Sequence, residues 1–152
     1  MKNICLICVM LFFLVGCGGA SDFSEKGHGE RKSSGNTISV TEAWELLRDK
    51  KLIVVDVRTP AEWRSTGTPK GAVRLSFQAH PQGIDGFIND LDKALGDDRE
   101  SAFAIICRTG SRTRRLAAYL REKGFSGVID IPEGMAGSAQ GRGWIRSDLP
   151  LD

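Results

Sequence analysis

A cysteine followed by a short basic, hydroxyl-rich turn is the part of this 152-residue sequence best suited to chemistry. Cys107 ends the apolar run 102–106, and the polar segment 108–112 follows it directly. The thiolate is the nucleophilic form of cysteine, and both neighbouring cations and helix N-termini favour that form. The position of Cys107 therefore predicts a nucleophilic sulfur that lies among positive groups.

The turn after Cys107 is predicted to be an anion-binding loop, because a helical pattern begins where the turn ends. Free amides of such a loop and of the first helical turn can converge on one point, where the helix dipole adds positive potential. The loop residues provide backbone freedom, hydroxyl donors and permanent charge: Arg108, Thr109, Gly110, Ser111 and Arg112. We expect an anion to bind directly above the sulfur.

The remaining sequence predicts the elements that would position this loop. Short apolar runs of strand length occur at 36–40, 52–57, 72–77, 102–106 and 127–131. Helical patterns occur at 39–50, 59–64, 84–95 and 111–124. Alternating strands and helices are typical of an α/β domain, in which a mainly parallel central sheet is flanked by helices on both faces. Ligands bind such sheets beyond the carboxyl ends of the strands, and Cys107 follows its strand at such an end.

Three motifs in order resemble the rhodanese family: DVRTPAEW (56–63), CRTGSR (107–112), and LREKGF (120–125) with EGMAG (133–137). The resemblance covers about residues 38–150 and implies a rhodanese-like fold with sulfurtransferase activity. It implies that Cys107 takes the outer sulfur of a small anionic donor, thiosulfate or polysulfide, as a persulfide. A thiol or cyanide-like acceptor then removes that sulfur.

The same resemblance assigns roles to the surrounding residues. The loop 108–112 would hold the anionic donor and the persulfide. Asp56, Arg58 and Glu62 would support the site from behind, with Arg58 paired to Glu62 and Asp56 supporting the neighbouring loop. The family chemistry requires no metal and no organic cofactor.

Three other interpretations of the cysteine differ in what they require. A cysteine phosphatase has its loop arginine six positions after the cysteine, whereas Arg112 comes at five and Thr113 at six, which disfavours that activity. A non-catalytic sulfur-carrier or binding module on the same scaffold remains the main alternative. Cys107 as a buried, inert thiol is the third, and the polar and basic residues that follow it count against this interpretation.

The N-terminus resembles a bacterial lipoprotein signal. Lys2 is followed by the apolar run 4–15, which is too short to span a membrane, and then by Gly16 and Cys17. We expect Cys17 to be lipidated, with an ordinary cleaved signal or a short membrane anchor as the alternatives. Gly18 then favours the outer membrane. This pattern predicts a domain held in the cell envelope by its lipid alone and facing the periplasm.

These features divide the chain into a cleaved signal (1–16), a lipidated N-terminus with a flexible tether (17–36), and a rhodanese-like domain (37–152). Cys5 and Cys8 would leave with the signal, so Cys107 would be the free thiol of the mature chain, with no partner for a disulfide and no cluster for zinc. Neither the net charge of +2 nor any motif in the sequence suggests nucleic acid, so we expect no nucleic-acid partner. We expect a monomer.

Overall fold

Four parallel strands form the central sheet of residues 36–152, which are the residues that the computed structural model describes. The strands are β1 (Ile53–Asp56), β2 (Val73–Arg74), β3 (Phe103–Ile106) and β4 (Val128–Asp130), in the spatial order β2-β1-β3-β4. All four residues of β3 are buried, as are three of the four in β1. This burial explains why the central strands are continuous apolar runs, and it confirms the prediction of a parallel sheet.

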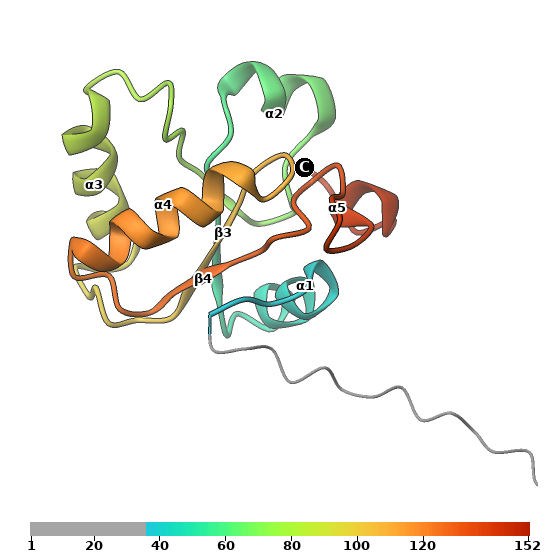
Figure 1. The fold of residues 1–152 in the computed structure, drawn as a ribbon, viewed down its shortest axis with the longest axis horizontal. Coiled ribbons are helices and arrows are strands. Elements are labelled where there is room, and N and C mark those ends of the chain that lie inside the picture. Colours follow the sequence, from blue (N-terminus) through green and yellow to red (C-terminus); the bar gives the residue numbers. More distant parts are fainter. Residues whose placement is uncertain (1–35) are drawn as a thin grey trace, which may run out of the picture. The chain divides into compact units, whose positions relative to one another are not determined.

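Helices cover both faces of this sheet, as predicted (Figure 1). The five helices of the described residues are α1 (Val40–Arg48), α2 (Pro60–Thr66), α3 (Gly83–Ala94), α4 (Ser111–Glu122) and α5 (Gly143–Arg146). One apolar core lies between the sheet and helices α3 and α4, where Phe87 and Leu120 are fully buried. The other lies beneath α1 and α5 and includes Ala43 and Trp144. The sheet is therefore held between two apolar cores, one on each face.

Local sequence signals explain where the helices begin and end. The Ser39 side chain accepts a hydrogen bond from the Glu42 amide and caps α1. Thr59 and Glu62 cap α2 reciprocally, with Pro60 in its first turn. The caps fix where the chain enters each helix, and Glu62 also takes part in the site described below.

Two predicted strands are shorter in the structure. Residues 36–40 contribute only an isolated bridge between Thr37 and Asp130, because Ser39 already caps α1. The segment 72–77 is a two-residue strand at the sheet edge, although Leu75 and Phe77 still donate backbone hydrogen bonds to Asp56 and Val57. The sequence pattern correctly predicted that both segments pair with the sheet, but it overestimated how many of their residues form regular strand pairs.

The predicted lipoprotein signal (1–16), Cys17 and the tether up to residue 35 lie outside the described residues. From residue 36 onward, no helix is long and apolar enough to cross a membrane.

Candidate active site

Cys107 leaves β3 at the carboxyl edge of the sheet and begins the loop that enters α4. Gly110 is the N-cap of α4 with a φ of 79°, in the left-handed region that favours glycine. A Cβ at this position would lie 2.2 Å from the carbonyl oxygen of Pro132. Gly134 makes a similar approach to the Arg108 carbonyl, at 2.5 Å from its own would-be Cβ. The two glycines therefore allow the cysteine loop to pack directly against the backbone that follows β4.

The segment after β4 also holds the loop through hydrogen bonds. The Met135 amide donates to the Cys107 carbonyl at 2.9 Å, and the Ala136 amide donates to the Arg108 carbonyl at 2.9 Å. These bonds use the carbonyl groups of the loop and leave its amides unoccupied. They fix the loop backbone without blocking its donors.

The amides of the loop have no partner within residues 36–152. None of the hydrogen bonds among these residues uses the backbone N–H groups from 108 to 112. The first amides of a helix lack intrahelical acceptors, and such donors form a ready anion site at a helix N-terminus. The Thr109 and Ser111 side-chain oxygens, 3.5 Å apart, add hydroxyl groups at the exposed side of the loop. The start of α4 thus combines backbone amides that have no acceptor among the described residues with two exposed hydroxyl groups.

Cys107 itself is fully buried, with 0% of its surface exposed, and packs in the apolar core beneath α4. Its Sγ lies 3.7 Å from the hydroxyl oxygen of Thr113. The burial is what the inert-thiol interpretation requires. The unpaired amides that follow the cysteine and the hydroxyl beside its sulfur are features that an inert core thiol does not need.

Arg112 is held at the loop by Glu62 of α2. Its Nη1 donates to Glu62 Oε2 at 2.8 Å and its Nη2 donates to Oε1 at 2.5 Å, a bidentate pair. The hydrogen bonds from Arg112, with help from Thr59, lower the pKa of Glu62 to about 2. The pairing with Glu62 raises the pKa of Arg112, and the nearby Cys107 sulfur adds to that rise. Arg112 therefore stays charged and stands near both the carboxylate and the sulfur.

The predicted pairing of Arg58 with Glu62 is wrong. Arg58 pairs with Asp56 instead, with Nε donating to Oδ1 at 2.9 Å and Nη2 donating to Oδ2 at 2.6 Å. Arg58 precedes the N-cap of α2, so the spacing of four residues to Glu62 does not place the two side chains on one helix face. Its guanidinium also donates to the Thr66 hydroxyl and the Gly67 carbonyl at the end of α2. Asp56 and Arg58 form a buried pair that fixes α2 to the end of β1.

A cavity of about 320 Å³ lies beside the cysteine loop. Its lining includes three charged residues and two residues of the segment after β4. The lining residues are Arg58, Glu62, Ser65, Thr66, Arg108, Met135, Ala136 and Ile145. Met135 and Ala136 are also the residues whose amides bind the loop. The cavity therefore adjoins the loop on the side where Arg108 is exposed.

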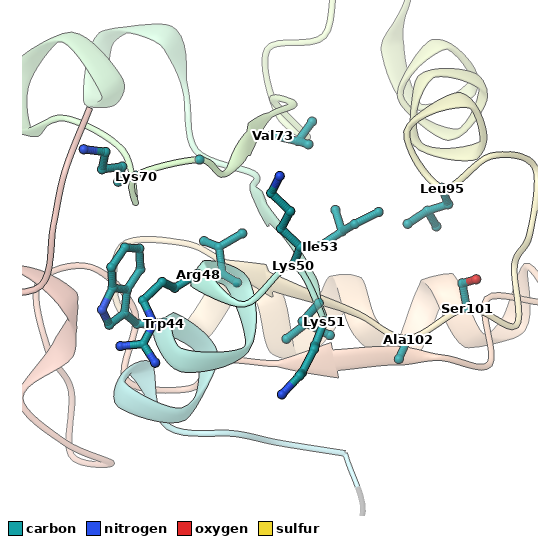
Figure 2. A pocket seen from close by; sticks show the side chains of 13 residues that line it. Trp44, Arg48, Lys50, Lys51, Ile53, Lys70, Val73, Leu95, Ser101 and Ala102 are labelled. Atoms are coloured by element: carbon teal, nitrogen blue, oxygen red, sulfur yellow. The ribbon is translucent and has the colours of Figure 1, made fainter.

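A larger cavity of about 730 Å³ lies elsewhere, at the amino ends of β1 and β3 (Figure 2). Its apolar lining is accompanied by four cations, Arg48, Lys50, Lys51 and Lys70. Figure 2 shows that these side chains point in different directions and not toward one point. Asp49 pairs with Arg48 and with Lys51. The larger cavity thus lacks the convergent donors found at the cysteine loop.

Sequence reasoning missed Thr113 as a site residue, although its position after the loop was noted. Nothing in its local pattern distinguishes it from the other hydroxyl residues, because the contact with Cys107 depends on how α4 leaves the loop. In the portion of the chain from residue 36, no group of three His, Cys, Asp or Glu side chains is placed to hold a metal ion.

Comparisons with known proteins show which family and which solved structures the chain is similar to. Residues 39–140 match the family described as rhodanese-like domain. The chain is 27% identical over 115 residues to the thiosulfate sulfurtransferase GlpE of Glaesserella parasuis serovar 5, covering 76% of this chain and 91% of that protein. It is 28% identical over 119 residues to the uncharacterized protein RP600 of Rickettsia prowazekii, covering 74% and 94%. The crystal structure of Rv0390 from M. tuberculosis superposes with a TM-score of 0.59 at 29% identity, covering 79% of this chain and 98% of the other.

Proposed function

Because the chain belongs to the rhodanese-like domain family, we propose that it is a sulfurtransferase that carries sulfur on Cys107. The observation that carries this proposal is the loop between Cys107 and α4, whose amides from 108 to 112 have no partner among residues 36–152. Unpaired amides at a helix N-terminus suit an anion, and both the donor and a cysteine persulfide are anions.

The reaction proceeds in two displacements. The Cys107 thiolate attacks the outer sulfur of thiosulfate, a new S–S bond forms, and sulfite leaves with the electron pair of the broken S–S bond. A thiolate or cyanide then attacks the outer sulfur of the persulfide and returns Cys107 to its thiolate form. A polysulfide donor follows the same course, with a shortened polysulfide as the leaving group. No metal or organic cofactor enters either displacement.

The loop residues divide this work between them. The free amides stabilise the charge on the persulfide, as preorganised donors do at other developing anions. Arg108 is exposed beside the 320 Å³ cavity and attracts the anionic donor. Arg112, fixed by Glu62, keeps a permanent positive charge near the sulfur. Asp56 and Arg58 act from behind by fixing the helix that carries Glu62.

Access to the sulfur requires a local movement. Cys107 has no exposed surface, whereas Arg108 and Thr109 are exposed above it. The proposal therefore includes a displacement of these two side chains when the donor enters from the adjoining cavity. The loop backbone can stay in place, because its carbonyl groups remain bonded to Met135 and Ala136.

The N-terminal pattern supports a second, separate proposal about location. Lipidation of Cys17 would anchor the domain in the cell envelope, facing the periplasm and at the outer membrane, with no other membrane contact. The domain would act there as a monomer on small sulfur compounds. Labelled palmitate should enter the wild-type protein and not a Cys17→Ser variant.

Steady-state kinetics test the sulfurtransferase proposal. Residues 21–152 are assayed for thiocyanate formation from thiosulfate and cyanide, and the dependence on both substrates should give the parallel lines of a double-displacement mechanism. A Cys107→Ser variant should form no thiocyanate. A sulfur-carrier module would accept sulfur on Cys107 without turnover, and a pure binding module would do neither. Absence of turnover with both thiosulfate and polysulfide, in folded and reduced protein, refutes the enzymatic proposal.

A further inference from the structure

A third cavity lies between α4 and the end of β4. Its volume is about 300 Å³, and its lining includes three charged residues, Asp130, Arg114 and Arg121. Asp130 is the last residue of β4, whereas the two arginines lie on one face of α4. Cys107 does not line this cavity, and the sulfurtransfer steps proposed above use none of the three charged residues. The cavity is therefore separate from the site of sulfur transfer.

Asp130 provides this cavity with a buried carboxyl group. Only 5% of the residue is exposed, and its Oδ1 atom is buried without a hydrogen-bond partner. No ion pair among residues 36–152 involves Asp130. An unpaired charge is costly to bury, so a carboxyl group of this kind in the wall of a cavity marks a candidate binding group.

The positive groups of the cavity act on this carboxyl group without pairing with it. Burial raises the pKa of Asp130, and the charges of Arg114 and Arg121 oppose that rise. Arg114 is exposed and belongs to no ion pair in the part of the chain from residue 36. Arg121 donates to the Val128 carbonyl at 3.2 Å. The cavity thus holds charges of both signs that do not neutralise one another by direct contact.

A small ligand with both charges would satisfy these groups together. An ammonium group has three N–H donors for the Asp130 carboxylate, and a ligand carboxylate accepts the paired N–H groups of an arginine. Gln140 adds a carboxamide group that can donate to the same ligand carboxylate. Ala117 and Pro132 add small apolar surfaces. A volume of about 300 Å³ is at the lower end of small-molecule pockets, so the ligand should have a short side chain.

Ligands with a single charge fit this lining less well. A simple anion would be attracted by the two arginines and repelled by the Asp130 carboxylate. A metal cation would be attracted by Asp130 and repelled by the arginines, and Asp130 belongs to no group of three metal-binding side chains in residues 36–152. The combination of charges therefore favours a ligand that carries one charge of each sign.

We propose that this cavity binds a small zwitterionic amino acid, with the ammonium group of the ligand at Asp130 and its carboxylate at Arg114. The binding is non-covalent, and no bond of the ligand forms or breaks. The proposal goes beyond sulfur transfer and does not rest on Cys107 being a nucleophile.

An NMR titration of the full-length protein tests this site. Glycine, L-alanine and β-alanine are each added to the ¹⁵N-labelled protein at pH 7, and the backbone amide signals are followed. N-acetylglycine and glycinamide are the matched probes, because the first lacks the ammonium group and the second lacks the carboxylate. The variants are Asp130→Asn and Arg114→Gln. Arg115→Gln is the control, because Arg115 is exposed on the same helix and does not line the cavity.

We expect at least one amino acid to shift the amide signals of Ala117 and Gln140 in a saturable way, while the signal of Val73 at the larger cavity stays in place. Each matched probe should bind about tenfold more weakly or worse than glycine, because it lacks one charged hydrogen-bonding group. Asp130→Asn and Arg114→Gln should weaken binding by a similar factor, whereas Arg115→Gln should bind like the wild type.

Two results would overturn the proposal. The first is the absence of saturable shifts with all three amino acids. The second is equal binding of glycine and N-acetylglycine, which would indicate a site for simple anions. Because Arg114 is exposed, Arg114→Gln decides the question if Asp130→Asn does not fold. None of these results depends on sulfur transfer, which the Cys107 assays test separately.

Discussion

Replacing Glu62 by glutamine tests how strongly the loop arginine is held in place. In the wild type the Glu62 carboxylate receives two hydrogen bonds from Arg112, at 2.8 and 2.5 Å, and two more from Thr59. Glutamine preserves the shape of the side chain and removes its charge. The variant therefore removes the charged pair and leaves the packing of α2 in place.

The pKa of Glu62 sets the size of the effect. It is lowered from 4.5 to about 2 by the bonds described above. A shift of this size corresponds to about 3 kcal/mol of folding free energy if solvent is ignored. The Glu62 side chain is 26% exposed, so screening by water reduces the expected value to about 1 to 2 kcal/mol.

The pH dependence follows from the direction of the shift. A carboxyl group with a lowered pKa in the folded state stabilises the fold fully above its unfolded pKa of 4.5. That contribution is lost as the pH falls from 4.5 toward about 2. The difference in stability between wild type and Glu62→Gln should therefore be constant from pH 7 down to pH 5 and should shrink below pH 4.5.

Urea unfolding of both proteins at pH 7, 5, 4 and 3 measures this difference. Glu122→Gln is the matched control, because Glu122 is exposed on α4 and no ion pair involves it within residues 36–152. The control should change the free energy of unfolding by less than about 0.5 kcal/mol at each pH. Equal stabilities of Glu62→Gln and Glu122→Gln at pH 7 would refute the inference that Glu62 holds Arg112 by a charged pair.

Three further variants probe the supports of the site, each measured by urea unfolding. Gly110→Ala should lower the free energy of unfolding by about 2 to 3 kcal/mol, because Gly110 has a positive φ and an added Cβ would overlap Pro132. Gly96→Ala is the control, because Gly96 has a φ of 68° with open space around it, and it should lower the free energy of unfolding by about 1 kcal/mol. Equal losses would show that the loop backbone can shift to accommodate the added methyl group. Arg58→Met should cost about 3 to 5 kcal/mol, because it leaves the Asp56 carboxylate buried without its partner, and a loss below 1 kcal/mol would contradict the buried pair. Asp130→Asn should stabilise the fold at pH 7, because burial raises the pKa of Asp130 and its ionised carboxyl group therefore destabilises the fold; the gain should disappear as the pH falls to 3.8. A loss of stability at pH 7 would contradict the assigned direction.

The fold and the position of the loop could be predicted from local sequence. Continuous apolar runs identified β1, β3 and β4, and the spacing of apolar residues identified α1, α3 and α4. The cysteine directly follows one of these runs, so its place at the carboxyl edge of a parallel sheet followed from the strand itself. These features depend on residues that are close together in the sequence, so local sequence patterns are sufficient to predict them.

The contacts around the sulfur could not be predicted in this way. Arg112 and Glu62 are fifty residues apart, and their pairing depends on α2 lying beside the start of α4. Arg58 was given the wrong partner because its spacing from Glu62 resembles a helical pair although it precedes the helix. Thr113 lies beside Cys107 because of the way in which α4 leaves the cysteine loop. Packing between distant elements determines the first of these contacts, and the way in which the chain enters α2 and α4 determines the other two.

The mass of the protein after treatment with thiosulfate tests the central claim most directly. Residues 21–152 contain Cys107 as the single cysteine, so an added sulfur atom can be assigned to it in the intact protein. We expect a gain of one sulfur atom that is removed by cyanide or excess thiol and is absent from Cys107→Ser. No gain with thiosulfate or polysulfide, in protein shown to be folded and reduced, would contradict the assignment of Cys107 as the sulfur carrier.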